Sequence, residues 1–360
     1  MGELSFQNNV PDPLLAKKEL PSFKFELEKS KGRVAGNSFG KEATVKQLPI
    51  SKGLAGVSMQ LEPGVMRELH WHATAAEWAF VIKGRVRTTV INPVGQTETN
   101  DFAPGDIWYF PRGHAHMLEC LGNELTHFIL IFDNGYFSEF GTFSITDWIG
   151  HAPKPLLAKN SSLPESAFDG FPKEEVYFAR GAIPPEKIPE NLQDPRIAPP
   201  QTHKFRMLSE APHGVFKGGC EWRVDSTRFP IATTVTGVIL DLEPGALREL
   251  HWHPNADEWQ YVIEGDVSVT MFGSHGRFRT ELLHTGDAGY IPQGYGHSIE
   301  NVGSEQSRIL IGFNSGIYQS IDLSSWIAGN PVDVLATNFS RPESLIRAFP
   351  RKDVFIAPGE

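Results

Sequence analysis

The six residues Arg-Glu-Leu-His-Trp-His occur twice in this chain, at 67–72 and again at 248–253. Residues around the first copy recur at the same spacing of 181 positions (248 minus 67). The recurring residues are Gly64, Glu77, Gly84, Gly105, Pro111, Gly113 and His116, matched by Gly245, Glu258, Gly265, Gly286, Pro292, Gly294 and His297. Because no residue is inserted or lost between these positions, each block is predicted to form one continuous core, and the chain is a tandem duplication.

The repeated histidines predict a metal site in each copy. Residues two apart in a strand project from the same face, so His70 and His72 point together. Glu77 follows across a short turn, and His116 arrives from a separate strand. Three imidazoles and one carboxylate suit a divalent first-row metal and leave coordination positions open for substrate and water. The second copy supplies the same set as His251, His253, Glu258 and His297. A single His-x-His often lies on a polar face without binding metal, but the full pattern occurring twice favours a metal site.

The composition is that of an ordinary soluble protein. The chain has 360 residues, 40% hydrophobic and 21% charged, which is enough for two domains. A formal net charge of -10 argues against nucleic acid or an anionic membrane as a partner, and no apolar run approaches a membrane span. Cys120 and Cys220 are too few for a disulfide framework, so we expect both to be reduced. Residues 1–20 lack the apolar core of a signal peptide, which favours the cytoplasm, with secretion after leader removal as the alternative.

Short β-rich runs separated by glycine and proline predict an all-β sandwich or barrel in each copy. In the first copy these runs are 57–61, 78–82, 86–91, 107–110 and 128–132. Barrel closure would bring His70 and His116 to one point. Helical segments are expected outside the barrels, at 143–160, 321–338 and 342–348, where they could dock one subunit on another. The predicted domains are an N-terminal arm at 1–43, a first barrel at 44–180, a proline-rich linker at 181–204 and a second barrel at 205–360.

The two copies diverge just after the last predicted core strand. Gly135 and Gly316 keep the usual spacing, but Trp148 and Trp326 are only 178 positions apart, so the second copy lacks three residues. The first copy therefore carries a longer loop at 136–142. Loops added to a rigid scaffold often carry function, and Glu139 gives this loop an ionisable group. Taken alone, the loop is also compatible with an exposed segment that carries an incidental glutamate.

The spacing of these motifs identifies both copies as members of the cupin family. The family pattern is Gly, five residues, His-x-His, four residues, Glu, six residues, Gly, followed by Gly, five residues, Pro-x-Gly, two residues, His. Both copies satisfy it; Asn301 completes the second motif, and Cys120 departs from it in the first copy at a position that does not bind metal. The resemblance implies two double-stranded β-helix (jelly-roll) barrels in tandem, with short flanking helices.

Over residues 45–339 the chain further resembles the oxalate decarboxylase family of bicupins. The resemblance rests on the two barrels, the repeated hexapeptide, Phe-Ser-Glu at 137–139 before Thr-Phe, and Thr-Asp-Trp at 146–148. It implies conversion of oxalate to formate and carbon dioxide with dioxygen as co-catalyst, two manganese ions per chain, and a homo-oligomer (trimer or hexamer). The implied manganese ligands are His70, His72, Glu77 and His116 in one barrel and His251, His253, Glu258 and His297 in the other.

The same resemblance assigns roles beside the first metal. The glutamate of the family's active-site lid falls on Glu139, and its substrate-contacting arginine falls on Arg67. The lid departs from the commonest family pattern at Phe140 and Gly141, where a polar pair is usual. Lid changes in this family shift the balance between decarboxylation and oxidation, so this departure bears on the product.

The second barrel keeps the arginine as Arg248, a candidate contact for substrate or another anion. Some family members have a further glutamate near this metal, and Gly312 takes the matching place here. With no acid expected near Arg248, the second site is predicted to be structural or auxiliary.

The chemistry of oxalate fits these roles. Breaking its carbon-carbon bond heterolytically would leave an unstabilised formyl anion, whereas removing one electron first eases the loss of carbon dioxide. Manganese can provide such redox chemistry and zinc cannot, although iron would fit the same ligands. Arg67 would hold the substrate oxygens with its planar donor fork, or else form a salt bridge with Glu68 or another barrel acid. Glu139 would accept a proton and return it to carbon under a closed lid that excludes water.

Three functions are therefore open, and the first is favoured: decarboxylation of oxalate at the site in the first barrel. The second is oxalate oxidase activity on the same scaffold, which yields carbon dioxide and hydrogen peroxide. The third is a non-enzymatic, storage-type bicupin; barrels of that kind have typically lost metal ligands, whereas both sets are complete here.

Overall fold

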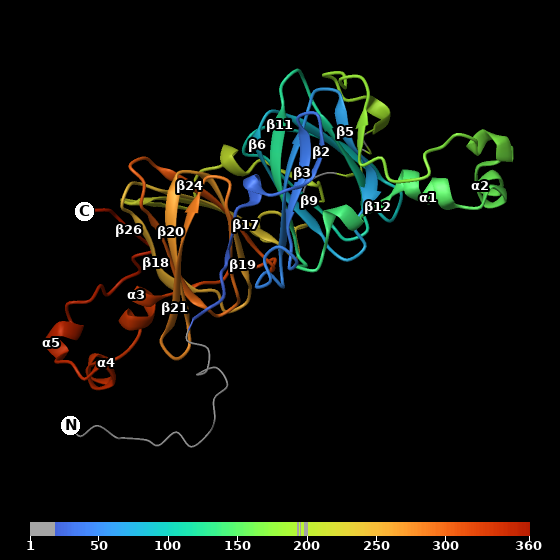
Figure 1. Cartoon of the computed structure of the whole chain (residues 1–360). Coiled ribbons are helices and arrows are strands. Elements are labelled where there is room, and N and C mark those ends of the chain that lie inside the picture. Colours follow the sequence, from blue (N-terminus) through green and yellow to red (C-terminus); the bar gives the residue numbers. More distant parts are fainter. Residues whose placement is uncertain (1–18, 193, 195, 198–200) are drawn as a thin grey trace, which may run out of the picture.

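The structure is a computed structural model that describes residues 19–192, 194, 196–197 and 201–360. It consists of two β-barrels side by side, each with a small helical arm, and the two arms extend from opposite ends of the molecule (Figure 1). Every strand pairing within the barrels is antiparallel. The predicted all-β class and the two cupin-like barrels are confirmed.

The first barrel has a seven-stranded and a six-stranded sheet. The larger sheet has the order β14-β9-β6-β11-β4-β3-β2, with β2 (Arg33–Ala35), β3 (Ser38–Ala43), β4 (Ala55–Leu61), β6 (Glu77–Lys83), β9 (Ile107–Phe110), β11 (Thr126–Phe132) and β14 (Lys204–Phe205). The smaller sheet has the order β12-β5-β10-β7-β8, with β13 on β5; the strands are β5 (Val65–Trp71), β7 (Val86–Ile91), β8 (Thr97–Phe102), β10 (Ala115–Cys120), β12 (Phe143–Ser144) and β13 (Phe178–Arg180). The five predicted runs are all strands.

The second barrel repeats this plan. Its larger sheet has the order β1-β22-β19-β24-β17-β16-β15, with β1 (Lys24–Phe25), β15 (Gly214–Phe216), β16 (Gly219–Val224), β17 (Thr236–Leu242), β19 (Glu258–Glu264), β22 (Ala288–Ile291) and β24 (Ser307–Phe313). Its smaller sheet has the order β21-β20-β23-β18-β25, with β26 on β18; the strands are β18 (Leu247–Trp252), β20 (Asp266–Gly273), β21 (Arg277–His284), β23 (Gly296–Asn301), β25 (Ile321–Asp322) and β26 (Ile356–Ala357).

The two barrels exchange their first edge strands. β1, near the start of the described chain, pairs with β22 of the second barrel, and β14, which follows the linker, pairs with β9 of the first. The predicted domain boundaries are therefore corrected. Residues 33–43 were assigned to an N-terminal arm, but they form β2 and β3 of the first barrel, and residue 204 of the predicted linker is part of that barrel too.

The barrels pack on each other through a shared apolar core. Trp78 on β6 lies against Gly237 on β17, and Trp259 on β19 lies against Gly56 on β4. Any side chain on either glycine would overlap the opposing indole ring, so the two contacts require glycine. Both tryptophans are fully buried within one cluster that contains residues from both barrels. Two further clusters fill the barrel interiors.

The helical segments are shorter than predicted. The segment at 143–160 contains β12, α1 (Ile145–His151) and α2 (Lys154–Ser161), and it is interrupted at Pro153, as expected of a proline that cannot continue a helix. The later segments contain β25, α3 (Leu323–Ala328), α4 (Val332–Phe339) and α5 (Glu343–Ile346). Short 3-10 turns lie at Leu27–Lys29, Glu139–Gly141, Glu165–Phe168, Glu190–Leu192 and Met207–Ser209. Among the described residues, no helix has the length and apolarity that a membrane span requires. Cys120 and Cys220 are free of disulfides, as predicted.

Candidate active site and metal centres

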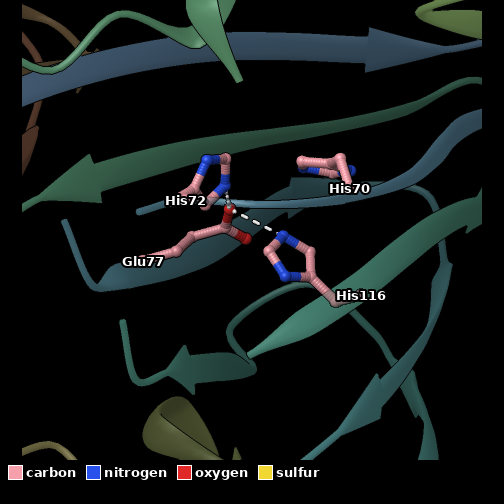
Figure 2. A group of neighbouring side chains, drawn as sticks. All are labelled: His70, His72, Glu77 and His116. Atoms are coloured by element: carbon pink, nitrogen blue, oxygen red, sulfur yellow. Dashed lines mark hydrogen bonds and ion pairs between the residues drawn. The ribbon is translucent and has the colours of Figure 1, made fainter. Parts of the chain in front are cut away.

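The structure brings the four predicted ligands of the first barrel together (Figure 2). His70 lies on β5 and His72 directly follows that strand, while Glu77 begins β6. His116 on β10 pairs directly with His70 across the smaller sheet. One possible ligand atom from each residue lies within 4.8 Å of the others, and all four side chains are buried. Ligands about 2.1 Å from a central ion lie at such mutual distances, so the group has the size of a metal site.

Backbone carbonyls orient two of the three imidazoles. The Nδ1–H of His70 donates to the carbonyl of Glu68 at 2.6 Å, and the Nδ1–H of His116 donates to the carbonyl of His114 at 2.9 Å. These bonds leave the Nε2 atoms to face the centre of the group, which is how metal-binding histidines are usually held. The Nε2 of His116 is buried, makes no hydrogen bond and lies 3.3 Å from Oε2 of Glu77 (Figure 2), as expected of two atoms that bind one ion.

Electrostatics also favours a cation at this point. Burial, with the charge of Arg67 as the next contribution, lowers the pKa of His70 well below its usual value, so this imidazole is in the neutral form that binds metal. Burial alone raises the pKa of Glu77, but His116 and His72 outweigh that effect and lower it, so the carboxylate is ionised. Three imidazoles and one carboxylate fit manganese or another divalent first-row metal.

The second barrel builds the same metal site from its own four predicted ligands. His251 lies on β18, Glu258 begins β19 and His297 lies on β23 opposite His251. Here all three histidines donate Nδ1–H to carbonyls, which belong to Glu249, Gln319 and Tyr295, at 2.7, 2.7 and 3.1 Å. Burial lowers the pKa of His251 well below its usual value, as it does for His70.

The metal-binding carboxylates are held differently in the two barrels. Glu77 accepts a hydrogen bond from the indole N–H of Trp108 at 2.7 Å, whereas Glu258 accepts one from the side-chain amide of Gln260 at 2.7 Å. The residue 181 positions after Trp108 is Gly289, and a side chain there would come within 2.9 Å of the Gln260 oxygen. Motif spacing gave no sign of either partner, because both occupy variable positions of the cupin pattern.

The loop at 136–142 covers the first metal site. Phe137 stacks on Phe132 with ring centroids 3.9 Å apart and meets the ring of His72 at 4.9 Å. Glu42 anchors the loop by accepting hydrogen bonds from the hydroxyl of Ser138 at 2.9 Å and the backbone N–H of Glu139 at 3.0 Å. Glu139 is only 1% exposed, so the alternative of an exposed loop with an incidental glutamate is wrong.

The two residues expected to act on substrate meet beneath this loop. The Nε–H of Arg67 donates to Oε1 of Glu139 at 2.8 Å, and its Nη2 donates to Thr142 at 2.6 Å. Glu175 lies 3.3 Å from the same Nη2, and the guanidinium lies over the ring of Tyr177, 4.0 Å from the ring centroid. Arg67 Nη1 and Glu139 Oε2 are buried and have no hydrogen-bond partner. One donor and one carboxylate oxygen are thus left for a ligand.

The alternative that Arg67 pairs with Glu68 is wrong. Glu68 accepts a hydrogen bond from the backbone N–H of Tyr177 at 2.6 Å, and its other oxygen accepts one from Thr146 at 2.5 Å. Besides Glu139, the acid that pairs with Arg67 is Glu175. It comes from the segment after the helical arm, where no motif pointed to it.

Two predictions about the second barrel need correction. Arg248 has an acidic neighbour, since its Nη1 lies 2.7 Å from Oδ1 of Asp322. Gly312 does not face the metal: a side chain there would meet Ile131 of the first barrel, and it is Ile311 that lines the cavity beside the metal ligands. Adjacent residues of a strand point to opposite faces, so the motif alignment was wrong by one position.

Comparisons with known proteins agree with this geometry. The cupin family model matches residues 29–166 and 208–343. The chain is 38% identical over 310 residues to oxalate decarboxylase OxdC of Bacillus subtilis, which covers 86% of this chain and 80% of that protein. It is 33% identical to a probable oxalate decarboxylase of Arthroderma benhamiae, over 94% of this chain and 83% of the relative.

Solved structures of oxalate decarboxylases also superpose on this chain. A structure of the Bacillus subtilis enzyme, in a study of its Mn(II) centres, superposes with a TM-score of 0.86 at 32% identity and covers 100% of this chain and 98% of that one. A formate complex of the Lactobacillus farciminis oxalate decarboxylase superposes with a TM-score of 0.85 at 35% identity, over 94% of this chain and 99% of that one. The chain therefore belongs to the cupin family and, within it, to the oxalate decarboxylases.

Proposed function

We propose that this protein converts oxalate to formate and carbon dioxide at the site in the first barrel, with manganese in both barrels and dioxygen as co-catalyst. The observation that carries the proposal is the buried Arg67 and Glu139 pair beside the first metal site, which keeps one donor and one acceptor free. The Mn(II) centres of the Bacillus subtilis relative and the formate in the Lactobacillus farciminis structure support it. The complete ligand sets argue against a storage-type bicupin.

The metal ligands, Arg67 and Glu139 have separate roles in the proposed reaction. Manganese held by His70, His72, Glu77 and His116 supplies one-electron redox chemistry when bound. Arg67 directs its free Nη1 at the oxygens of mono-anionic oxalate and fixes the substrate's orientation. Glu139 takes the oxalate proton on its free Oε2 and, after the carbon-carbon bond breaks and carbon dioxide leaves, returns that proton to carbon. The reaction balances, since hydrogen oxalate yields one carbon dioxide and one formate.

The buried loop also favours decarboxylation over oxidation. Phe137 and Glu139 are buried, so the loop shields the reacting carbon from bulk water, and the placed acid supplies the proton that formate requires. In an oxidase the same carbon would instead lose a second electron and leave as a second carbon dioxide, while dioxygen accepts both electrons and is released as hydrogen peroxide. The two outcomes therefore depend on whether Glu139 delivers its proton.

The test is product analysis with oxalate under air and under nitrogen. Glu139→Gln should lower formate production about 10²- to 10⁴-fold, raise the share of peroxide, and keep two manganese ions per chain. The exposed Glu174→Gln is the matched control, with wild-type products expected. Formate production at the wild-type rate by Glu139→Gln would refute the role of this acid, and peroxide as the main wild-type product would establish the oxidase.

The surface suggests how copies of the chain assemble. We propose a trimer or hexamer that uses the two helical arms, because both carry exposed aromatic side chains: Trp148 on α1 is 66% exposed and Trp326 on α3 is 58% exposed. Apolar cavities of about 680 and 450 Å³ adjoin these tryptophans. Light scattering of wild type and of Trp148→Ser combined with Trp326→Ser checks this, with a smaller particle expected for the variant. The cytoplasmic location stays a prediction, to be checked by cell fractionation.

A further inference from the structure

Glu221 on β16 is a buried carboxyl for which the proposed reaction has no use. Its side chain is 2% exposed, and its Oε1 has no hydrogen-bond partner. The nearest cation to that oxygen is Nη1 of Arg223, at 3.9 Å, which is too long for a hydrogen bond. Burial raises the pKa of Glu221, and the charges of Arg223 and Arg248 offset this only in part. A buried oxygen without a partner is costly, so a ligand for it is expected.

Glu221 lies in the same cavity as the second metal site. The cavity is lined by Arg248, His251, His253 and Glu258 together with Glu221, and Ile311 closes part of its wall. The space available to the centre of a water molecule is about 10 Å³, which corresponds to one water molecule. Oxalate, with six heavy atoms, does not fit. Nη2 of Arg248 is also buried there without a partner, so the cavity holds a free donor and a free carboxyl oxygen.

Glu221 also separates this cavity from a larger one. A surface cavity of about 560 Å³ is lined by Glu221 and Phe355, and both side chains line the inner cavity too. The side chains of these two residues therefore form the wall between the second metal site and this surface cavity. Removing the Glu221 side chain would join the two spaces.

The acid is matched to this barrel and has no counterpart in the first. The residue 181 positions before Glu221 is Gly40, where any side chain would collide with the hydroxyl of Tyr177. Phe355 takes the place of Tyr177 in the second barrel, since each precedes a short strand that pairs with the arginine-bearing strand, and each ring lies under its arginine. Phenylalanine lacks the hydroxyl, and its absence leaves room for a carboxyl from β16.

We propose that Glu221 is a positioning residue of the second metal site: it hydrogen-bonds a single water molecule in the open coordination position and keeps the cavity closed to carboxylate ligands. The second barrel then holds its metal with a water-sized ligand, whereas the first barrel accepts oxalate. This inference rests on metal binding by the second set of ligands and not on oxalate turnover.

The test uses manganese-loaded protein, crystallography and Mn(II) electron paramagnetic resonance, with sodium formate as the probe. Wild type should show one ordered water molecule within hydrogen-bond distance of Glu221 and no formate at the second manganese. Glu221→Ala should open the wall, and formate should then occupy the second site with at least about tenfold higher affinity and a changed manganese spectrum. Glu221→Gln keeps the volume and a polar group, so it should exclude formate as wild type does.

Three results would overturn the inference, two with the proteins above and one with a further variant. One is formate at the second manganese of wild type at the same concentration. Another is a Glu221→Ala protein whose second cavity stays closed and whose spectrum does not respond to formate. If Glu221→Ala does not fold, Glu221→Leu replaces it; this variant fills the wall but removes the hydrogen-bond partner of the coordinated water, so the manganese spectrum should change while formate stays excluded. A manganese spectrum of Glu221→Leu identical to that of wild type would also contradict the assignment. None of these measurements uses oxalate, so the inference and the proposed decarboxylation can fail separately.

Discussion

The two barrels hold nearly the same metal site in different surroundings. In the first, an acid from the loop after the last core strand, Glu139, meets Arg67 beneath a buried lid. In the second, Arg248 pairs with Asp322, and the free acid is Glu221, from a strand that precedes all the metal ligands of that barrel. The ligands have stayed fixed at one spacing while the side chains around them have changed.

The changes come in pairs that compensate each other. Where the first barrel has Trp108 as the donor to its metal-binding carboxylate, the second has Gly289 and uses Gln260 in the space that the glycine frees. Core packing accounts for this, since a large side chain can enter only where a neighbour becomes smaller. The residues that the two barrels share are therefore those that metal binding requires, and the residues that differ determine the function of each site.

The largest effect should come from removing one ligand in each barrel. His72→Ala and His253→Ala should each lose one of the two manganese ions, because each removes one of four ligands. Only His72→Ala should abolish formate production, by more than about 100-fold, since even loss of an outer partner of a ligand costs about 10- to 100-fold. Metal analysis and a formate assay check this. Equal loss of activity in both variants would mean that both barrels take part in turnover.

The next largest effect concerns the two arginines. Arg67→Lys keeps the charge but loses the planar fork that contacts Glu139 and Thr142, so kcat/KM for oxalate should fall about 10- to 100-fold. Arg248→Lys should change kcat/KM much less, because the cavity beside Arg248 has no room for oxalate. Steady-state kinetics with both variants measures the difference. An equal fall in the two variants would contradict the assignment of oxalate to the first barrel.

Removing the hydrogen-bond donors to the metal-binding carboxylates should have a smaller effect on manganese affinity, and each removal should affect one barrel only. Trp108→Phe removes the indole donor to Glu77 and should weaken manganese binding in the first barrel about tenfold, while the second barrel is unchanged. Gln260→Leu should do the reverse. Competition with a chelator, followed site by site in the manganese spectrum, gives both affinities. Weaker manganese binding in the second barrel of Trp108→Phe, or in the first barrel of Gln260→Leu, would contradict these hydrogen-bond assignments.

The metal sites could be predicted completely from sequence, and the reason is geometric. His-x-His on a strand places both rings on one face, and the fixed spacing places His116 in register with His70. The lid acid was predicted through the family resemblance, because its place after the last strand is shared. These predictions depended on local spacing or on a shared motif.

What could not be predicted depended on contacts between distant segments. Glu221 precedes its metal ligands by a full strand and belongs to no motif, so only the folded barrel shows that it reaches the second cavity. Gly312 was predicted to lie beside the second metal, but Ile311 lines that cavity. A shift of one residue along a strand moves the side chain to the opposite face, and the sequence does not reveal such a shift. The exchange of β1 and β14 between barrels was equally hidden, since a two-residue strand has no sequence pattern of its own.

The smallest effect concerns the exchanged strand β14 and depends on pH. Glu98 on β8 accepts hydrogen bonds from the backbone N–H of His203 at 2.9 Å, from its ring at 2.5 Å and from Thr202 at 2.5 Å. Burial alone raises the pKa of Glu98, but these bonds outweigh it and lower the pKa to about 2. Because the folded pKa is below the unfolded one, the stabilisation is present above the unfolded pKa of 4.5 and is lost as the pH falls toward 2.

Glu98→Gln should therefore lower the free energy of unfolding by about 1–2 kcal/mol at pH 7, and the difference from wild type should shrink as the pH falls from 4.5 to about 2. Thermal unfolding across this pH range measures it, with the exposed Glu165→Gln as the control that should match wild type throughout. The second barrel fixes its exchanged strand β1 through Lys24 and Asp287, 2.8 Å apart, and this pair does not include Glu98. A pH-independent difference would show that Glu98 stabilises the strand as a neutral group, because only an ionised carboxylate loses its contribution on protonation.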